Sequence, residues 1–261
     1  IEPGVYSSKC ISEDKCGLCI TACRQQALLF AGGSIAGIDR SRCIGCMKCA
    51  AACPAEAVSA WGEKMSLGEV MAAIEKDRAF YEKSGGGVTV SGGEPLVQKD
   101  FTRSILKACC ETGIHTCLES TFCTDWETVE AAAEYADLLI SDIKHMDSEI
   151  HKEYTGAGNE KILANLKRLA ACGHDMILRI PVIPGINDDT ENIIKTADYI
   201  EDNIGDRLRV LQLLSFMRMG EEKCRSLGRT YEMDSLEFDR EKFQQRVEDI
   251  AAYFNSRGIH C

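Results

Sequence analysis

The stretch Val88-Thr-Val-Ser-Gly-Gly-Glu-Pro95 joins a short apolar strand to a turn with two glycines. Four further strand segments follow it at residues 114–118, 138–143, 176–182 and 208–214. Most of these segments are nearly continuous in Val, Ile and Leu, which is typical of strands that are covered on both faces. The pattern therefore predicts a parallel sheet that is packed against helices.

Amphipathic helices are expected between these strands. Helix starts are indicated by a capping box at Ser66 and Glu69 and by the N-caps Asp100 and Asn159. Helix ends are indicated by Gly113, Gly173 and Gly258, and one further helix is expected at Trp126–Tyr135. A helix stands before the first strand, so we expect one more strand upstream in the chain. Five strands plus that one predict an α/β fold, a partial six-stranded barrel.

Polar residues follow the strands where the active sites of such folds lie, at the carboxyl ends. They are Ser91–Pro95, Glu119–Thr121, Asp142, Lys144, Arg179, Pro184–Asp188 and Ser215–Arg218. Together they offer carboxylates, hydroxyls, cations and bare glycine backbone, which suits a ligand with both a carboxylate and an ammonium group. Other interpretations stay open, because Gly92-Gly93 could be a plain turn, Asp142 and Lys144 a surface ion pair, and Arg179 a structural residue.

Cysteine is unusually frequent, with 15 residues of which eight lie between Cys10 and Cys53. These eight form two similar blocks, Cys10-x5-Cys16-x2-Cys19-x3-Cys23 and Cys43-x2-Cys46-x2-Cys49-x3-Cys53-Pro54. The second block has the spacing C-x2-C-x2-C-x3-C-P of bacterial ferredoxins. In the first block the gap before Cys16 is longer, and Arg24 stands where proline usually follows the fourth cysteine.

The fourth cysteine of such a block binds the other cluster of the pair. We therefore assign one [4Fe-4S] cluster to Cys10, Cys16, Cys19 and Cys53, and the second to Cys23, Cys43, Cys46 and Cys49. Structural zinc is the alternative, since C-x2-C pairs also bind it. The chain is expected to divide into a ferredoxin-like α+β domain at 1–62 and the barrel at 63–261.

Composition excludes several classes of function. The 261 residues carry 30 Lys and Arg against 41 Asp and Glu, a net charge of −11 that opposes binding to nucleic acid or anionic membranes. No apolar run approaches the roughly 18 residues of a membrane helix. The odd cysteine total and the cysteine-poor remainder argue against a secreted disulfide scaffold, so we expect a reducing, anaerobic cytoplasm. The chain begins at Ile1 without a visible signal peptide, and we expect its natural N-terminus to be missing.

The chain resembles the glycyl-radical-enzyme activating enzymes of the radical S-adenosylmethionine (SAM) superfamily. It is similar to the pyruvate formate-lyase activating enzyme-like subgroup with an inserted two-cluster ferredoxin domain. Three segments carry the resemblance: Val88–Pro95, Ser141-Asp-Ile-Lys-His-Met-Asp147 with Tyr154-Thr-Gly156, and Arg179–Asp188. The resemblance implies a partial (βα)6 radical SAM barrel.

The resemblance also implies a site and a reaction. Gly92, Gly93 and Glu94 would hold the ammonium group of SAM, and Glu119 and Ser120 would face its ribose and methionine portions. Asp142 would take the family's Asp-x-Lys position, and Lys144 and Arg179 would lie near the SAM carboxylate. Met217 stands where relatives commonly carry His. A reduced cluster would cleave SAM, and the adenosyl radical would abstract hydrogen from a glycine of a partner glycyl radical enzyme. This chemistry needs no general acid or base. A monomer reduced by flavodoxin or ferredoxin is expected.

Besides Met217, the sequence departs from the family in a second respect. The Cys-x-x-x-Cys-x-x-Cys motif that holds a third, SAM-binding [4Fe-4S] cluster is absent. We expect that motif, like the extra strand, in a missing N-terminal segment, so that the truncated chain alone is inactive; natural loss in a degenerate homologue is the alternative. Two other functions stay open: a non-catalytic iron–sulfur electron carrier on a degenerate barrel, and a radical SAM enzyme with a different substrate.

Overall fold

The computed structural model describes all 261 residues and contains two compact units. The first unit comprises Ile1–Met65 and Met217–Glu237, and the second comprises Ser66–Phe216 and Phe238–Cys261. The boundary therefore lies at residue 65 instead of the expected residue 62, and the division differs in a second respect. The segment 217–237, which was expected in the barrel, groups with the N-terminal residues.

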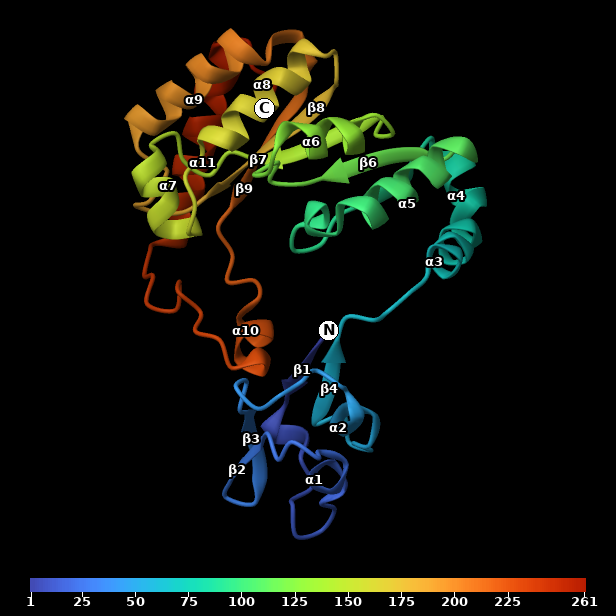
Figure 1. Ribbon diagram of the computed structural model, residues 1–261. Helices are drawn as coiled ribbons and strands as arrows, with labels where there is room; N and C mark the ends of the chain where they lie inside the picture. Colours follow the sequence, from blue (N-terminus) through green and yellow to red (C-terminus); the bar gives the residue numbers. More distant parts are fainter. The chain divides into compact units, whose positions relative to one another are not determined.

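The first unit is built from two short antiparallel strand pairs and small helices (Figure 1). Strand β1 (Glu2–Val5) pairs with β4 (Val58–Trp61), and β2 (Leu28–Ala31) pairs with β3 (Ser34–Ile38). Helices α1 (Leu18–Ala22) and α2 (Lys48–Ala51) each begin just before the last two cysteines of a block. The core is small and includes Ile35, Val58 and the buried thiol of Cys49.

Long-range hydrogen bonds explain why helix α10 (Glu221–Leu227) belongs to the first unit. The Arg40 guanidinium donates to the carbonyl oxygens of Pro3 and Leu227, both at 2.9 Å. The indole Nε1 of Trp61 donates to Ser226 Oγ at 3.0 Å. These partners lie too far apart in the chain for periodicity or spacing to reveal them.

The second unit contains a parallel sheet whose strands follow one another in chain order, β5-β6-β7-β8-β9. Its strands are β5 (Gly87–Val90), β6 (His115–Glu119), β7 (Leu138–Asp142), β8 (Met176–Val182) and β9 (Leu208–Ser215). All five agree with the sequence-based expectation within two residues, and the α/β fold class is confirmed. A Cβ atom on Gly87 would lie 1.9 Å from the carbonyl oxygen of His115, so β5 can begin this close to β6 only with glycine there.

Helices connect the strands and cover one face of the sheet (Figure 1). They are α3 (Leu67–Ile74), α4 (Arg78–Ser84), α5 (Lys99–Glu111), α6 (Trp126–Ala133), α7 (Ser148–Thr155), α8 (Glu160–Ala171), α9 (Thr190–Asn203) and α11 (Arg240–Ser256). Strand residues such as Leu118 and Leu178 pack against helix residues such as Leu166 in one core. Because strand side chains alternate between faces, residues such as Glu119 and Arg179 lie on the other face.

The caps only partly follow the sequence pattern. The capping box of Ser66 and Glu69 is present in full. Asp100 lies inside the first turn of α5, which begins at Lys99. Asn159 occupies the N-cap position of α8, but its side chain makes no capping hydrogen bond.

The ends of the 217–237 segment meet in the second unit. The ring of Phe216, at its start, packs edge-on against Phe238 with centroids 5.7 Å apart, and Phe238 packs against Phe243 at 5.1 Å. The chain thus leaves and re-enters the second unit at one aromatic cluster. None of the helices combines the length and the apolar character that crossing a membrane requires.

Candidate functional site

A cavity of about 180 Å³ opens at the carboxyl ends of β5, β6 and β7. We call it the strand-end cavity; its lining consists of Gly92, Gly93, Glu119, Ser120, Thr121, Ser141, Asp142 and Lys144. Six of these were expected to contact SAM, so three separate segments of sequence do meet in space. Thr121, named only among the polar residues after the strands, and Ser141, quoted only within a family segment, were given no role in binding SAM.

The glycine pair leaves its backbone open in this cavity. Gly92 has φ +144°, a conformation that side-chain-bearing residues rarely adopt. A Cβ atom placed on either Gly92 or Gly93 would meet nothing within 4 Å. The backbone groups of this turn are therefore available to a ligand.

Glu94 sits beside the cavity with its carboxylate fully engaged. The carboxylate accepts hydrogen bonds from Leu96 N (2.9 Å), Ser120 Oγ (2.8 Å), Thr121 N (2.9 Å) and Thr121 Oγ1 (2.6 Å). A carboxylate offers about four acceptor positions, so none is left over. Burial alone would raise the pKa of Glu94, but these hydrogen bonds outweigh it and leave the pKa lowered. Glu94 thus ties the loop after β5 to the end of β6, and it does not line the cavity.

Two ion pairs place charges of both signs at the strand ends. Lys144 Nζ lies 2.6 Å from Asp142 Oδ2, and both residues line the cavity. Arg179 reaches from β8 past β7 to Glu119 on β6 at 3.0 Å, and its Nε donates to Gln212 Oε1 at 3.1 Å. Arg179 does not line the cavity itself, but it forms an ion pair with Glu119, which does.

Three buried asparagine side chains hold the loop that follows β7. Asn187 donates to the carbonyl oxygen of Lys144 at 2.8 Å, and Asn192 accepts from Met146 N at 2.8 Å. Asn159 donates to the carbonyl oxygens of His145 and Met146 at 2.9 and 3.0 Å. The sequence interpretation missed this role, because it treated Asn159 as a helix cap.

Ser141 carries the only buried side-chain oxygen or nitrogen without a hydrogen-bond partner. The residue is 2% exposed, and it alternates along the strand with the core residues Leu139 and Ile143. Strand alternation therefore turns its side chain toward the helices, while its neighbour Asp142 turns toward the cavity.

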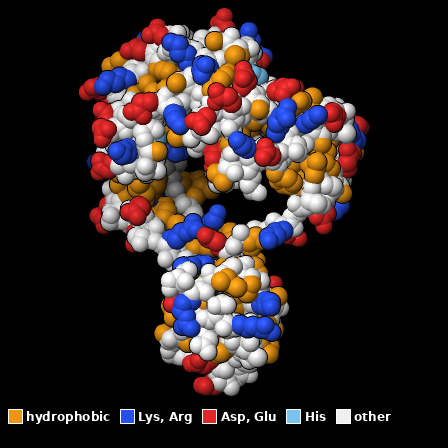
Figure 2. All heavy atoms as spheres, viewed as in Figure 1, with side chains coloured by type: hydrophobic (Ala, Val, Ile, Leu, Met, Phe, Trp, Pro, Cys, Tyr) orange, Lys and Arg blue, Asp and Glu red, His pale blue; other side chains and the backbone are white.

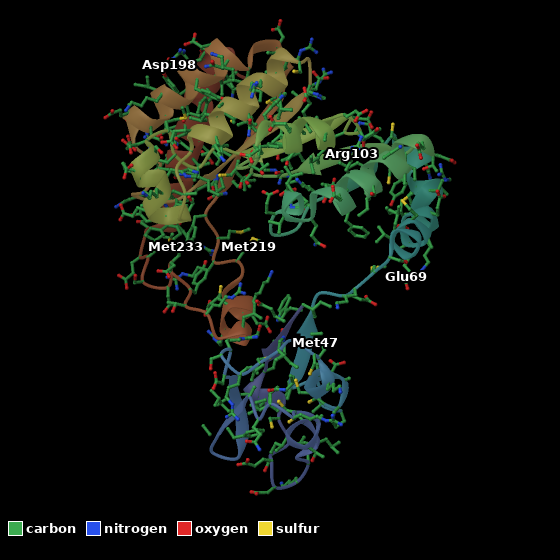
Figure 3. The ribbon with its side chains drawn as sticks, viewed as in Figure 1. Met47, Glu69, Arg103, Asp198, Met219 and Met233 are labelled. Atoms are coloured by element: carbon green, nitrogen blue, oxygen red, sulfur yellow. The ribbon has the colours of Figure 1, made fainter.

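The eight N-terminal cysteines surround two cavities in the first unit. The first cysteine cavity is lined by Cys10, Cys16, Cys19 and Cys53. The second, of about 270 Å³, is lined by Cys23, Cys43, Cys46 and Cys49. These are the same two sets of four that the ferredoxin spacing assigns to separate clusters. In Figure 3 sulfur atoms gather beside α1 and α2, near the labelled Met47.

The thiols within each set influence one another. Burial and then the charges of Cys53 and Cys10 raise the pKa of Cys19, and burial with the charges of Cys23 and Cys43 raises that of Cys49. No three His, Cys, Asp or Glu side chains converge closely enough to hold a single metal ion. Zinc-binding thiolates would all lie about 2.3 Å from one ion, and neither set of four thiols has that spacing. The first cysteine cavity, of about 20 Å³, is much smaller than the second.

Met217, the remaining expected SAM contact, is 60% exposed and belongs to the first unit. Its role stays a prediction. The exposed Cys123 accompanies the strand-end loops, where its backbone N–H donates to Thr121 Oγ1 at 3.2 Å.

The chain is similar in sequence to two family models and to several known activating enzymes. The sequence model of the Radical SAM superfamily matches residues 41–197, and that of a 4Fe-4S dicluster domain matches residues 9–57. The (2S)-3-sulfopropanediol dehydratase activating enzyme of Klebsiella oxytoca is 51% identical over 99% of this chain and 82% of its own length. The isethionate sulfite-lyase activating enzyme of Desulfovibrio desulfuricans is 38% identical over 89% of this chain and 74% of its own.

A solved structure shares the fold of about two thirds of this chain. The crystal structure of a domain of pyruvate-formate lyase-activating enzyme from Bacteroides vulgatus superposes with a TM-score of 0.54 at 31% identity. The match covers 67% of this chain and 96% of that one.

Proposed function

Since this chain belongs to the glycyl-radical-enzyme activating enzymes of the radical SAM superfamily, we propose that its strand-end cavity is the SAM site. Enzymes of this family cleave SAM reductively, and the resulting 5′-deoxyadenosyl radical takes a hydrogen atom from a glycine of the partner enzyme. The observation that carries the proposal is the shared lining of Gly92, Gly93, Asp142 and Lys144. Open backbone and charges of both signs suit the amino-acid end of SAM.

Each lining residue has a role that its chemistry allows. Carbonyl oxygens of Gly92 and Gly93 accept from the SAM ammonium, and Lys144 donates to its carboxylate. Glu119 and Ser120 face the ribose hydroxyls. Glu94, whose acceptor positions are occupied, keeps the glycine turn in place instead of binding the ammonium directly.

We further propose that the two cysteine cavities hold two [4Fe-4S] clusters. The support is the separation of eight cysteines into two enclosing sets of four. A third cluster, which activates SAM, requires a Cys-x-x-x-Cys-x-x-Cys motif, and the 261 residues do not contain one. Electrons come from a small redox protein such as flavodoxin or ferredoxin.

The partner we propose is a glycyl radical enzyme of the (2S)-3-sulfopropanediol dehydratase type. The relative named for that dehydratase is 51% identical to this chain, against 38% and below for relatives named for other partners. The substrate of this chain is then a glycine-bearing loop of the dehydratase, not the sulfonate itself.

Electron paramagnetic resonance tests the function directly. The protein, together with the third-cluster motif, is reconstituted anaerobically, reduced, and mixed with SAM and the dehydratase. We expect a SAM-dependent glycyl radical signal on the dehydratase, and a much weaker one when isethionate sulfite-lyase replaces it. The absence of any SAM-dependent radical on either partner would contradict the proposed function.

A further inference from the structure

The first unit presents different charges at its two cysteine cavities. The lining of the second cavity includes Arg24 and Lys48 and no carboxylate. The lining of the first cavity includes Glu13 and neither lysine nor arginine. An acidic protein would therefore meet favourable charge in the lining of only the second cavity, although Lys9 and Lys15 lie near the first.

The cations near the second cavity are free to bind a partner. Arg24, Arg42 and Lys48 are exposed and form no salt bridge within the chain. The one hydrogen bond among their side chains joins Arg42 to Gln26 Oε1 at 3.4 Å. An incoming carboxylate can thus pair with these cations without displacing an internal partner.

The same surface brings a cysteine to solvent. Cys46 is the one exposed thiol among the eight, since the other seven are half-buried or buried. Its neighbour Ile44 is 68% exposed, which adds an apolar contact beside the cations. We call this surface the Cys46 face and define it as Arg24, Arg42, Ile44, Cys46 and Lys48. In Figure 2 the visible side of the first unit carries Lys and Arg side chains among hydrophobic and some acidic ones.

Net charge differs between the two units as well. The first unit has eleven Lys and Arg and eleven Asp and Glu, so the second unit carries the whole net charge of −11. An acidic protein is repelled by the second unit and meets a neutral first unit with a local positive face. Such a distribution steers association, and salt weakens it.

We propose that the Cys46 face is the docking surface for an acidic, one-electron carrier protein. The inference rests on the proposed function, because that function requires a donor of electrons for the clusters. Carboxylates of the carrier pair with Arg24, Arg42 and Lys48, and an apolar rim around its own cofactor covers Ile44. The carrier then lies against the cysteine nearest to solvent.

Binding measurements with an acidic flavodoxin as the probe test this surface. Arg24→Gln together with Lys48→Gln removes two charges from the Cys46 face. Lys9→Gln with Lys15→Gln, on the side of the first cavity, makes the same charge change as a control. We expect the first pair to weaken flavodoxin binding about five- to tenfold and to flatten its salt dependence, while the control changes it less than about twofold.

Carbodiimide cross-linking locates the contact independently of affinity. The reagent joins a lysine ammonium to a carboxylate that it touches, so peptide mapping should find flavodoxin linked at Lys48. Cross-links confined to Lys15 or to lysines of the second unit, or equal losses in both variant pairs, would overturn the proposal.

Unchanged cluster absorbance shows that the variants are folded. A glycyl radical formed with a chemical reductant, but without flavodoxin binding, would reject this surface and leave the proposed function intact.

Discussion

At the residue scale, the carboxylate of Glu94 joins the loop after β5 to the end of β6. Glu94 was expected to face the SAM ammonium, but its carboxylate accepts four internal hydrogen bonds. A motif places a residue near a ligand, whereas its hydrogen-bond partners depend on loops that fold together from distant segments. Ser120 and Thr121, 26 and 27 residues away, supply three of the four donors.

Glu94→Gln should destabilise the second unit. A glutamine cannot accept all four hydrogen bonds and brings its own donors against them, so we expect a loss of about 2 kcal/mol or more at pH 7. Urea unfolding of cluster-free protein, followed by far-ultraviolet circular dichroism, measures the loss. The exposed Glu127→Gln is the control, with a change within about 0.5 kcal/mol.

The difference in unfolding free energy between the native protein and Glu94→Gln should depend on pH. The folded-state pKa of Glu94 is lowered from an ordinary value of 4.5, so its contribution is fully present above that pH. As the pH falls below 4.5 toward the lowered pKa, the folded state loses this advantage. The stability gap between the native protein and Glu94→Gln should therefore narrow at acid pH. A gap that widens there would contradict the assigned role.

Cys10 tests the cluster assignment at a single residue. The gap between Cys10 and Cys16 is longer than the two residues of the ferredoxin pattern. Cys10 nevertheless lines the same cavity as Cys16, Cys19 and Cys53. The reconstituted chain should hold about eight iron atoms, four per cluster. Cys10→Ala should lower the iron content toward half, while Cys172→Ala, an exposed cysteine of the second unit, should leave it unchanged. Full iron content in Cys10→Ala would remove Cys10 from the ligand set.

At the element scale, periodicity located the strands and most helices because each depends on a local pattern of apolar residues. Strand ends then predicted which loops would meet, since the carboxyl ends of parallel strands share one edge of the sheet. What periodicity could not supply is the packing of those loops. Asn159 precedes α8, Asn187 lies in the loop before α9 and Asn192 lies in the first turn of α9, and only the folded chain shows that all three hold the loop after β7.

Asn187→Ala tests that arrangement. The change removes the donor to the carbonyl oxygens of Lys144 and Pro181 and the acceptor for Ile183 N, leaving three backbone groups without these partners. We expect a stability loss of about 2 kcal/mol and SAM binding weakened about tenfold as Lys144 shifts. Asn203→Ala, which breaks a single bond to Tyr199 at the end of α9, is the control. Unchanged SAM affinity in Asn187→Ala would show that the loop does not position Lys144.

At the scale of the whole molecule, the cysteine blocks and the strand pattern predicted two domains and their order. The prediction failed at the segment 217–237, which belongs to the first unit. Its attachment depends on Arg40, Trp61 and Ser226, residues that carry no recognisable motif and whose contacts span up to 187 positions. Long-range polar contacts of this kind leave no periodic trace in a sequence.

The central claim is that the strand-end cavity binds the zwitterionic end of SAM, and SAM affinity of Lys144→Ala tests it most directly. Lys144 contributes the one cation in the cavity lining. Its loss should raise the SAM dissociation constant about tenfold or more, because a charge-assisted hydrogen bond contributes about 1.5–3 kcal/mol. Lys161→Ala, an exposed lysine paired with Asp125, should leave the constant unchanged. An unaltered dissociation constant in Lys144→Ala would contradict the account.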